Sequence, residues 1–206
     1  LPTGSLRLSG VSNIAGLAGF AAGAWWVQDA AAALPAKLLG DVAGKRVYDL
    51  CAAPGGKTMQ LAAAGAQVTA VDIAGPRLKL ILENLQRTKL SAETVKADIL
   101  EWAPEAKADA ILLDAPCSAT GTIRRRPDIL WSKQEEDIAA LAGLQAALID
   151  RAAALLAPGG VLVYAVCSLQ PEEGEAQIEK ALDRHPRLSR EPIGAGEIGG
   201  LNEALT

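Results

Sequence analysis

The chain has 206 residues, of which 50% are hydrophobic and 21% are charged, and its formal net charge is −4. This length suits one α/β domain, and the balance of apolar and charged residues excludes a disordered chain. Binding of nucleic acid by a general electrostatic attraction needs a basic surplus. Any binding of nucleic acid must therefore be local or assisted by another domain.

The cysteines and the histidine argue against a metal centre. Cys51, Cys117 and Cys167 lie far apart without a CxxC pair, and the chain has one histidine, His185. This pattern favours neither a zinc site nor a disulfide framework, so we expect no metal and a reducing, cytoplasmic location.

One uncharged stretch, between Arg7 and Asp29, has the length of a membrane span. Its several Gly, Ser and Asn residues are too polar and flexible for a transmembrane helix. It also lacks the basic and Leu-rich regions of a signal peptide. We therefore expect a cytoplasmic monomer without membrane contacts.

From about residue 45, short apolar runs alternate with helical patterns. Strands are predicted at 46–50, 67–71, 94–97, 110–113 and 161–166. Helices are predicted at 57–64 and 76–87, from a capping box at 132–135 to 158–160, and after Pro171. In the helix predicted at 76–87, the expected buried face consists of Leu78, Ile81, Leu82 and Leu85. In the helix that begins at the capping box, it consists of Ile138, Leu141, Leu144, Leu148 and Leu155. Apolar strands that alternate with helices predict an α/β fold with a mostly parallel sheet covered on both faces.

The two ends of the chain differ from this pattern. Residues 1–44 are a loop-rich lead-in with an Ala-rich helix predicted at about 29–39, and we expect them to form a flap packed on a domain of residues 45–206. After Ser189 the pattern fades into Gly and Glu without a final strand.

Ligands of open α/β sheets bind at the carboxyl ends of the strands. The first predicted strand ends in the loop CAAPGGK, residues 51–57. It is not a phosphate-binding loop, which needs glycine at position 51, and it is not GxGxxG. Both nucleotide-phosphate interpretations lose their support, and a cofactor without phosphates is favoured. Gly55 and Gly56 would still let a ligand approach the backbone closely.

Two acidic residues follow the next two strands. Asp72 lies about 20 residues beyond the loop, the spacing at which an acid hydrogen-bonds ribose hydroxyls. It could equally be the N-cap of the following helix. Asp98 could cap a helical turn or contact an adenine amino group.

The last two strands end in thiols. Asp114 and Cys117 follow the fourth strand, and Cys167 follows the fifth. A nucleophilic thiol needs partial exposure and nearby positive potential, and Arg124, Arg125 and Arg126 lie in the loop after Cys117. Each thiol could alternatively be a small buried apolar group, and the arginines a solvated loop.

In this order, DLCAAPGGKT, VD, KAD, DAPCSATGT and VCS resemble the S-adenosylmethionine-dependent RNA cytosine-C5 methyltransferases of the Fmu/Sun type. The resemblance covers about residues 25–181 and is strongest to the bacterial enzymes of small-subunit ribosomal RNA. It implies a Rossmann-like class I methyltransferase fold. It also implies methyl transfer from S-adenosylmethionine to C5 of a cytosine in RNA through a covalent cysteine–C6 adduct, with S-adenosylhomocysteine as the other product.

The resemblance also implies roles for residues. Cys167 would be the nucleophile, Cys117 would assist product release, and Asp114 would lie between cofactor and cytosine. The implied cofactor-binding residues are Cys51, Ala52, Ala53, Pro54, Gly55, Gly56, Lys57, Asp72, Arg77, Asp98 and Asp114. We expect Arg124, Arg125 and Arg126 to contact RNA phosphates. The chemistry agrees, because thiolate addition to C6 turns C5 into a carbon nucleophile strong enough to attack a sulfonium methyl group.

Two other functions stay open. One is a methyltransferase that acts on another RNA, such as tRNA, or on a protein, for example at a nitrogen atom of a base or of a protein side chain. The other is a non-catalytic RNA-binding assembly factor that has kept the fold. The chain also departs from the family pattern at Gly174, where Asn is frequent. From the resemblance we expect the domain of residues 45–206 to be C-terminally incomplete, without the family's closing hairpin. We expect residues 1–206 to contain no counterpart of the N-terminal RNA-binding domain of the bacterial ribosomal enzymes of this type.

Overall fold

The computed structural model describes residues 1, 3–10 and 13–200. One parallel sheet is at its centre, with the strand order β3-β2-β1-β4-β5. The strands are β1 (Arg46–Leu50), β2 (Gln67–Asp72), β3 (Glu93–Lys96), β4 (Ala108–Asp114) and β5 (Leu156–Ala165). The predicted α/β architecture with a parallel sheet is confirmed.

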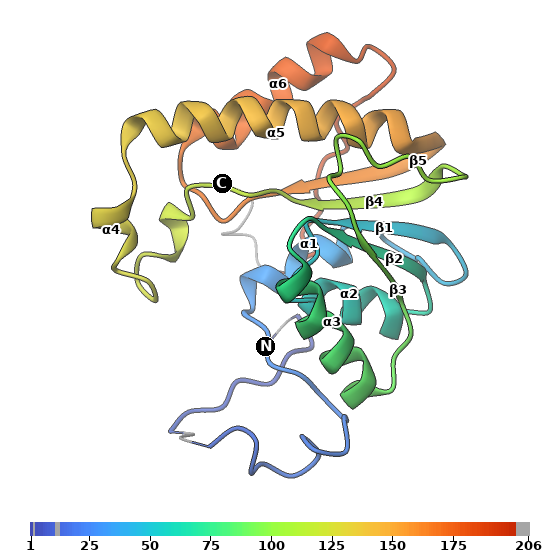
Figure 1. Cartoon of the computed structure of the whole chain (residues 1–206), viewed down its shortest axis with the longest axis vertical. Helices are drawn as coiled ribbons and strands as arrows, with labels where there is room; N and C mark the ends of the chain where they lie inside the picture. The colour runs from blue at the N-terminus through green and yellow to red at the C-terminus, as the bar shows by residue number, and fades with distance from the viewer. Residues whose placement is uncertain (2, 11–12, 201–206) are drawn as a thin grey trace.

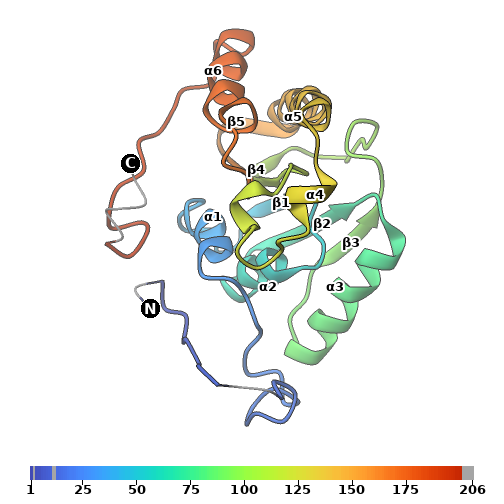
Figure 2. The ribbon, with the colours of Figure 1, turned by 90° about the vertical axis from the view of Figure 1, so that its left-hand side faces the viewer.

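Helices cover both faces of this sheet (Figures 1 and 2). The helices are α1 (Leu34–Lys37), α2 (Gly56–Ala63), α3 (Gly75–Thr88), α4 (Ile129–Ser132), α5 (Glu135–Leu155) and α6 (Glu175–Arg184). Short 3-10 turns are η1 (Ala31–Ala33), η2 (Thr120–Thr122) and η3 (Pro171–Glu173). In Figure 1, α5 and α6 lie above the sheet, and α1, α2 and α3 lie below it.

The alternation of side chains along the strands builds a core on each face. Toward α5, the strands present residues such as Leu50, Ile111 and Leu113, which pack with Leu148 and Ile149. Toward α1 and α2, the intervening strand residues Val47, Ala110 and Leu112 pack with Leu61 of α2 and with Leu39, which follows α1. Because both faces are buried, the central strands are largely apolar, although β1 also carries the fully buried Asp49.

The longest helix differs from the prediction at its start. Ser132 ends α4, and α5 begins at Glu135 with a capping box formed by Gln134 and Asp137. Leu144, expected in the buried stripe, is 39% exposed, whereas the neighbouring Gln145 is fully buried. The inward face of α5 is therefore rotated from the predicted stripe, because it meets polar groups as well as the apolar sheet.

The end of this helix also differs from the prediction. The chain passes directly from Leu155 of α5 into β5, so residues 158–160 do not end the helix. They lie where the register of β4 and β5 shifts, between the pairs Ala108–Leu156 and Ala110–Val161. Pro and Gly are tolerated there because β5 is an edge strand with an irregularity.

One more helix prediction needs correction. In α3, Leu82 is 50% exposed and lies outside the buried stripe, which consists of Leu78, Ile81 and Leu85.

Among the described residues, α5 is long and apolar enough to cross a membrane. Core helices of soluble proteins have the same length and composition, and Leu148 of α5 packs against the sheet.

The segment before β1 contacts the sheet and α3. Its Leu39 and Val42 belong to the core below the sheet, and the helix predicted at 29–39 is the shorter η1 and α1. Farther upstream, the Arg87 guanidinium donates hydrogen bonds to the carbonyls of Phe20 and Trp25 and lies 4.2 Å from the Phe20 ring centroid. The predicted ranges 1–44 and 45–206 include residues 2, 11–12 and 201–206, which lie outside the described residues.

The strand order places a topological switch point between β1 and β4, from which the chain extends in opposite directions across the sheet. Loops on either side of such a point diverge and leave a crevice beside the strand ends. The glycines of the loop after β1 make its turn possible, because Gly55 has a φ of 99° immediately before α2.

A test of this tight loop compares two glycines. A Cβ at Gly55 would lie 3.1 Å from Ile81 Cγ1, whereas a Cβ at Gly40, where φ is 67°, would meet nothing within 4 Å. We expect Gly40→Ala to lower the free energy of unfolding by about 1–2 kcal/mol, the cost of a left-handed residue. Gly55→Ala should lower it further because of the crowding. Urea denaturation measures both, and equal losses would contradict tight packing at Ile81.

Candidate active site

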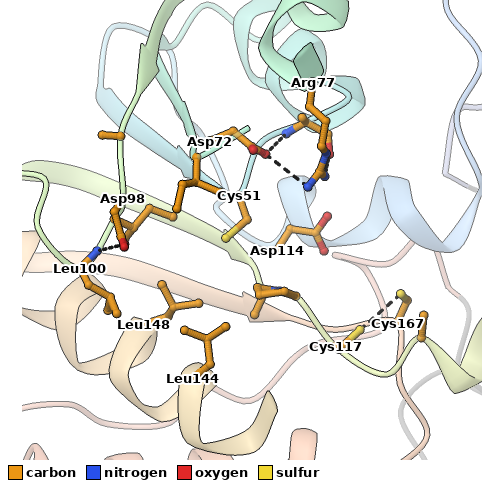
Figure 3. Close-up of a pocket in the computed structure, with 17 residues that line it drawn as sticks. Cys51, Asp72, Arg77, Asp98, Leu100, Asp114, Cys117, Leu144, Leu148 and Cys167 are labelled. Atoms are coloured by element: carbon orange, nitrogen blue, oxygen red, sulfur yellow. Dashed lines mark hydrogen bonds and ion pairs between the residues drawn. The ribbon is translucent and has the colours of Figure 1, made fainter. Parts of the chain in front are cut away.

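A cavity of about 340 Å³ opens at the carboxyl edge of the sheet (Figure 3). Residues that follow all five strands line it, together with two leucines of α5. They are Cys51, Ala53, Asp72, Ile73, Arg77, Ala97, Asp98, Ile99, Leu100, Asp114, Ala115, Pro116, Cys117, Ala119, Leu144, Leu148 and Cys167. Figure 3 shows Asp98 toward one end, Cys117 and Cys167 at the other, and Asp114 between them.

The cavity brings together most of the predicted functional side chains. Of the predicted cofactor-binding residues, those that line it are Cys51, Ala53, Asp72, Arg77, Asp98 and Asp114. Those that do not are Ala52, Pro54, Gly55, Gly56 and Lys57. The latter residues shape the loop and the start of α2 rather than the cavity wall.

Sequence reasoning missed the apolar wall of the cavity. Ile73 directly follows Asp72, and Ile99 directly follows Asp98, so their positions after strand-end acids were an available signal. Leu144 and Leu148 are four residues apart on one face of α5, a spacing assigned to the core instead. These side chains give the cavity an apolar wall beside its acidic residues.

Asp72 is buried and joins two loops. Its Oδ2 accepts a hydrogen bond from the Ala53 N–H at 3.1 Å, and its Oδ1 accepts one from the Ala74 N–H at 2.9 Å. Arg77 donates to the Ala53 carbonyl at 2.6 Å and lies 3.8 Å from Asp72 Oδ2. The N-cap of α3 is Ala74, so Asp72 is not the helix cap that was one of its two interpretations.

Asp98 caps a turn and also lines the cavity. Its Oδ1 accepts a hydrogen bond from the Leu100 N–H at 2.9 Å. The turn-capping interpretation is therefore correct, and the same side chain lies within the cavity wall.

A lysine at the start of α2 forms an ion pair with an aspartate at the end of β4. Lys57 Nζ lies 2.7 Å from Asp114 Oδ2, and the side chains are 13% and 37% exposed, respectively. Lys57, predicted beside the cofactor, thus points toward the part of the cavity that holds the thiols. The pair couples the orientations of α2 and the loop after β4.

The two predicted catalytic thiols are in contact. Cys117 Sγ lies 3.4 Å from Cys167 Sγ, and Cys167 is the more exposed of the two. The hydrogen bond from Cys117 lowers the pKa of Cys167 to about 7, with help from the Lys57 charge and against the effects of burial and Asp114. The same hydrogen bond, with burial, raises the pKa of Cys117. Cys167 is therefore the better nucleophile, because more of it is thiolate near neutral pH.

Cys51 has a different environment. Burial, followed by the charge of Asp72, raises the pKa of its thiol to about 12. A thiol with this pKa stays protonated near neutral pH, which suits a wall residue rather than a nucleophile.

The arginine loop does not line the cavity. Arg125 lies 3.3 Å from Asp29, and Arg126 lies 3.3 Å from Asp128. Arg124, Arg125 and Arg126 are all exposed. The expected positive potential at the thiols instead comes from Lys57, whose charge lowers the pKa of Cys167.

Comparison with known proteins finds the same family by sequence and by structure. Residues 36–204 match the family model described as 16S rRNA methyltransferase RsmB/F. The ribosomal RNA small subunit methyltransferase B of Salmonella arizonae is 45% identical over 95% of this chain and 47% of its own length. The protein of the same name from Serratia proteamaculans is 48% identical over 88% of this chain and 43% of its own length.

The structural comparison agrees. The crystal structure of NSun6 from Pyrococcus horikoshii matches with a TM-score of 0.74 and 32% identity, over 84% of this chain and 46% of that one. This chain spans about half the length of the curated relatives that it matches. Its sheet has the Rossmann-like class I methyltransferase fold. By the extent of the family match and the identity to these relatives, the chain belongs to the 16S rRNA methyltransferase RsmB/F family.

Proposed function

We propose that this chain transfers a methyl group from S-adenosylmethionine to C5 of a cytosine in small-subunit ribosomal RNA. The observation that carries the proposal is the thiol pair, with Sγ atoms 3.4 Å apart, at one end of a cavity lined by Asp72 and Asp98. Family membership supports ribosomal RNA as the substrate.

The cavity suits S-adenosylmethionine, which supplies the methyl group on a sulfonium sulfur. The backbone N–H groups of Ala53 and Ala74 fix the Asp72 carboxylate, which would accept hydrogen bonds from the ribose hydroxyls. Ile73 and Ile99 provide apolar surface for the adenine ring, and Asp98 would accept from its amino group. The volume of about 340 Å³ lies within the range of small-molecule sites.

Methyl transfer to C5 begins at Cys167. Its thiolate adds to C6 of the cytosine, a C6–S bond forms, and the ring π electrons move toward C5 and N3. The ring thereby gains negative charge, which the Lys57 ammonium stabilises. Asp114, ion-paired with Lys57 at 2.7 Å, holds that ammonium in place. The pair, rather than Asp114 alone, therefore acts at this step.

Product release is the role proposed for Cys117. After methyl transfer, C5 carries both the methyl group and a proton. Loss of that proton restores the C5–C6 double bond, and the C6–S bond electrons return to Cys167. While Cys167 is bonded to C6 it no longer raises the pKa of Cys117, the effect seen in the free protein. Cys117 can then lose its own proton to solvent and, as the thiolate, accept the proton that leaves C5.

The target cytosine must leave its stack to reach the cavity. The exposed Arg124, Arg125 and Arg126 would contact phosphates beside it.

The thiol pair argues against two alternative functions. A non-catalytic assembly factor or a methyltransferase of a nitrogen atom has no use for an acidified cysteine paired with a second thiol.

The cofactor assignment predicts the effect of Asp72→Ala. This change removes the acceptor for the ribose hydroxyls, so binding of S-adenosylhomocysteine should weaken by about 1–3 kcal/mol. Titration calorimetry measures this, with Asp183→Ala, at an exposed position of α6, as the control. Unchanged affinity in a variant that remains folded would refute the assignment.

The two thiols should fail differently. Cys167→Ser removes the nucleophile, so neither a covalent RNA adduct nor methylation is expected. Cys117→Ser should still form the adduct but break it down slowly, so a methylated protein–RNA band should accumulate on a denaturing gel. The Cys117→Ser, Cys167→Ser double variant should lose that band.

The full-length protein, labelled RNA and labelled cofactor are used for this gel. A band for Cys167→Ser instead would exchange the two roles. Normal methylation by both single variants would leave the cysteines as ordinary strand-end residues.

The RNA contact predicts a change in salt dependence. Replacing Arg124, Arg125 and Arg126 with Ala should reduce the log–log slope of RNA affinity against salt by up to about one unit for each lost phosphate contact. The control replaces three exposed cations elsewhere, Lys37, Lys79 and Lys180. If both triple variants keep the wild-type slope, the arginine loop does not bind RNA.

A further inference from the structure

A buried polar cluster lies behind the two thiols and has no role in the chemistry described so far. Its centre is Glu173, the last residue of η3, which is fully buried. Ser118 and Gln145 are also fully buried. Ser118 directly follows Cys117, and Ser168 directly follows Cys167.

The Glu173 carboxylate connects the two cysteine-bearing loops. Its Oε2 accepts hydrogen bonds from the hydroxyls of both serines, Ser118 and Ser168, the latter at 2.5 Å. Its Oε1 accepts from the Ser118 N–H at 2.9 Å. The two serine hydroxyls lie 3.0 Å apart. One side chain therefore holds the residue after each catalytic thiol.

Further hydrogen bonds hold Glu173 itself. Gln145 of α5 donates to Glu173 Oε1 and to the Pro116 carbonyl, both at 2.9 Å. The Tyr164 hydroxyl donates to the Glu173 carbonyl at 2.6 Å. Gln145 of α5 thus fixes the Glu173 carboxylate, and Tyr164 of β5 fixes its backbone, so the side chain that holds both loops is itself held in place.

These contacts explain how a carboxylate can be buried here. Burial by itself would raise the pKa of Glu173, but the hydrogen bonds from Ser118, Ser168 and Gln145 outweigh it and lower the pKa. A buried anion is tolerated only where donors replace its lost hydration. Because it is fully buried, Glu173 can act on the reaction only through its neighbours.

We propose that Glu173 is a positioning residue that holds the loops of Cys117 and Cys167 at the spacing at which the two thiols hydrogen-bond. Loosening either loop would lengthen the Sγ–Sγ distance of 3.4 Å. Cys167 would then lose the hydrogen bond that most favours its thiolate. The consequence for methylation rests on the proposed function, but the state of the thiol does not.

The test is alkylation of Cys167 by iodoacetamide as a function of pH, followed by peptide mass mapping. Wild-type Cys167 should react with a midpoint near its pKa of about 7. Glu173→Gln keeps the side-chain size but replaces one acceptor oxygen by an amide donor. In either orientation of the amide, the two serine hydroxyls or the Ser118 N–H and Gln145 then lose their acceptor. The midpoint should move up toward the ordinary value of about 8.5, and the alkylation rate at pH 7 should fall by up to about tenfold.

Matched variants separate positioning from folding. Glu172→Gln changes the exposed neighbouring glutamate and should leave the midpoint unchanged. Ser168→Ala keeps the carboxylate and removes one donor, so it should give a smaller upward shift, even if Glu173→Gln fails to fold. Lys57 and Asp114, the other charged groups that act on Cys167, are intact in all of these variants.

The outcomes are distinct. A lower melting temperature with an unchanged Cys167 midpoint in Glu173→Gln and Ser168→Ala would make the cluster purely structural and overturn the proposal. Because alkylation needs neither RNA nor cofactor, this failure is independent of the proposed function. In methylation assays of the full-length protein, Glu173→Gln should lower kcat with little change in KM for RNA.

Discussion

Parallel pairing of all five strands is the constraint on which this site depends. Parallel strands end at one edge, so residues separated by more than 110 positions in sequence, such as Cys51 and Cys167, line one cavity. Reversal of the winding direction beside β1 leaves the crevice open there. The loop after β1 therefore lies opposite the loops that carry the thiols, and Lys57 can reach Asp114 across the strand ends at 2.7 Å.

Three buried acids then fix the loops around that crevice. Asp72 accepts from the backbone on both sides of its loop, and Glu173 accepts from both serines. Asp49, beneath the loop after β1, accepts from the Thr58 hydroxyl at 2.6 Å. Burial raises the pKa of Asp49 to about 7, whereas the several donors around Glu173 lower its pKa. Burial favours the neutral form of both acids, and the number of hydrogen-bond donors thus decides whether that effect is outweighed.

The thiol pair shows why identical side chains can take different roles. Cys117 and Cys167 share one hydrogen bond, but Cys167 is more exposed and lies within reach of the Lys57 charge. The proton of this hydrogen bond therefore stays on the less exposed Cys117 sulfur, and Cys167 is the thiolate. The asymmetry that a two-cysteine mechanism needs is thus present before any substrate binds.

The sequence by itself determined the elements and the chemistry of the strand ends. Apolar strands, the glycine loop at 51–57 and the acids and thiols after the strands are local patterns, and they identified the sheet and most of the polar cavity residues. It did not determine which residues meet across the sheet. The Lys57–Asp114 pair and the Glu173 cluster join segments 57 and 55 residues apart, respectively. The rotation of α5, which exposes Leu144 and buries Gln145, follows from the same cluster. Such contacts depend on the packing of distant elements, and hydrophobic periodicity carries no information on which polar partner a buried side chain finds.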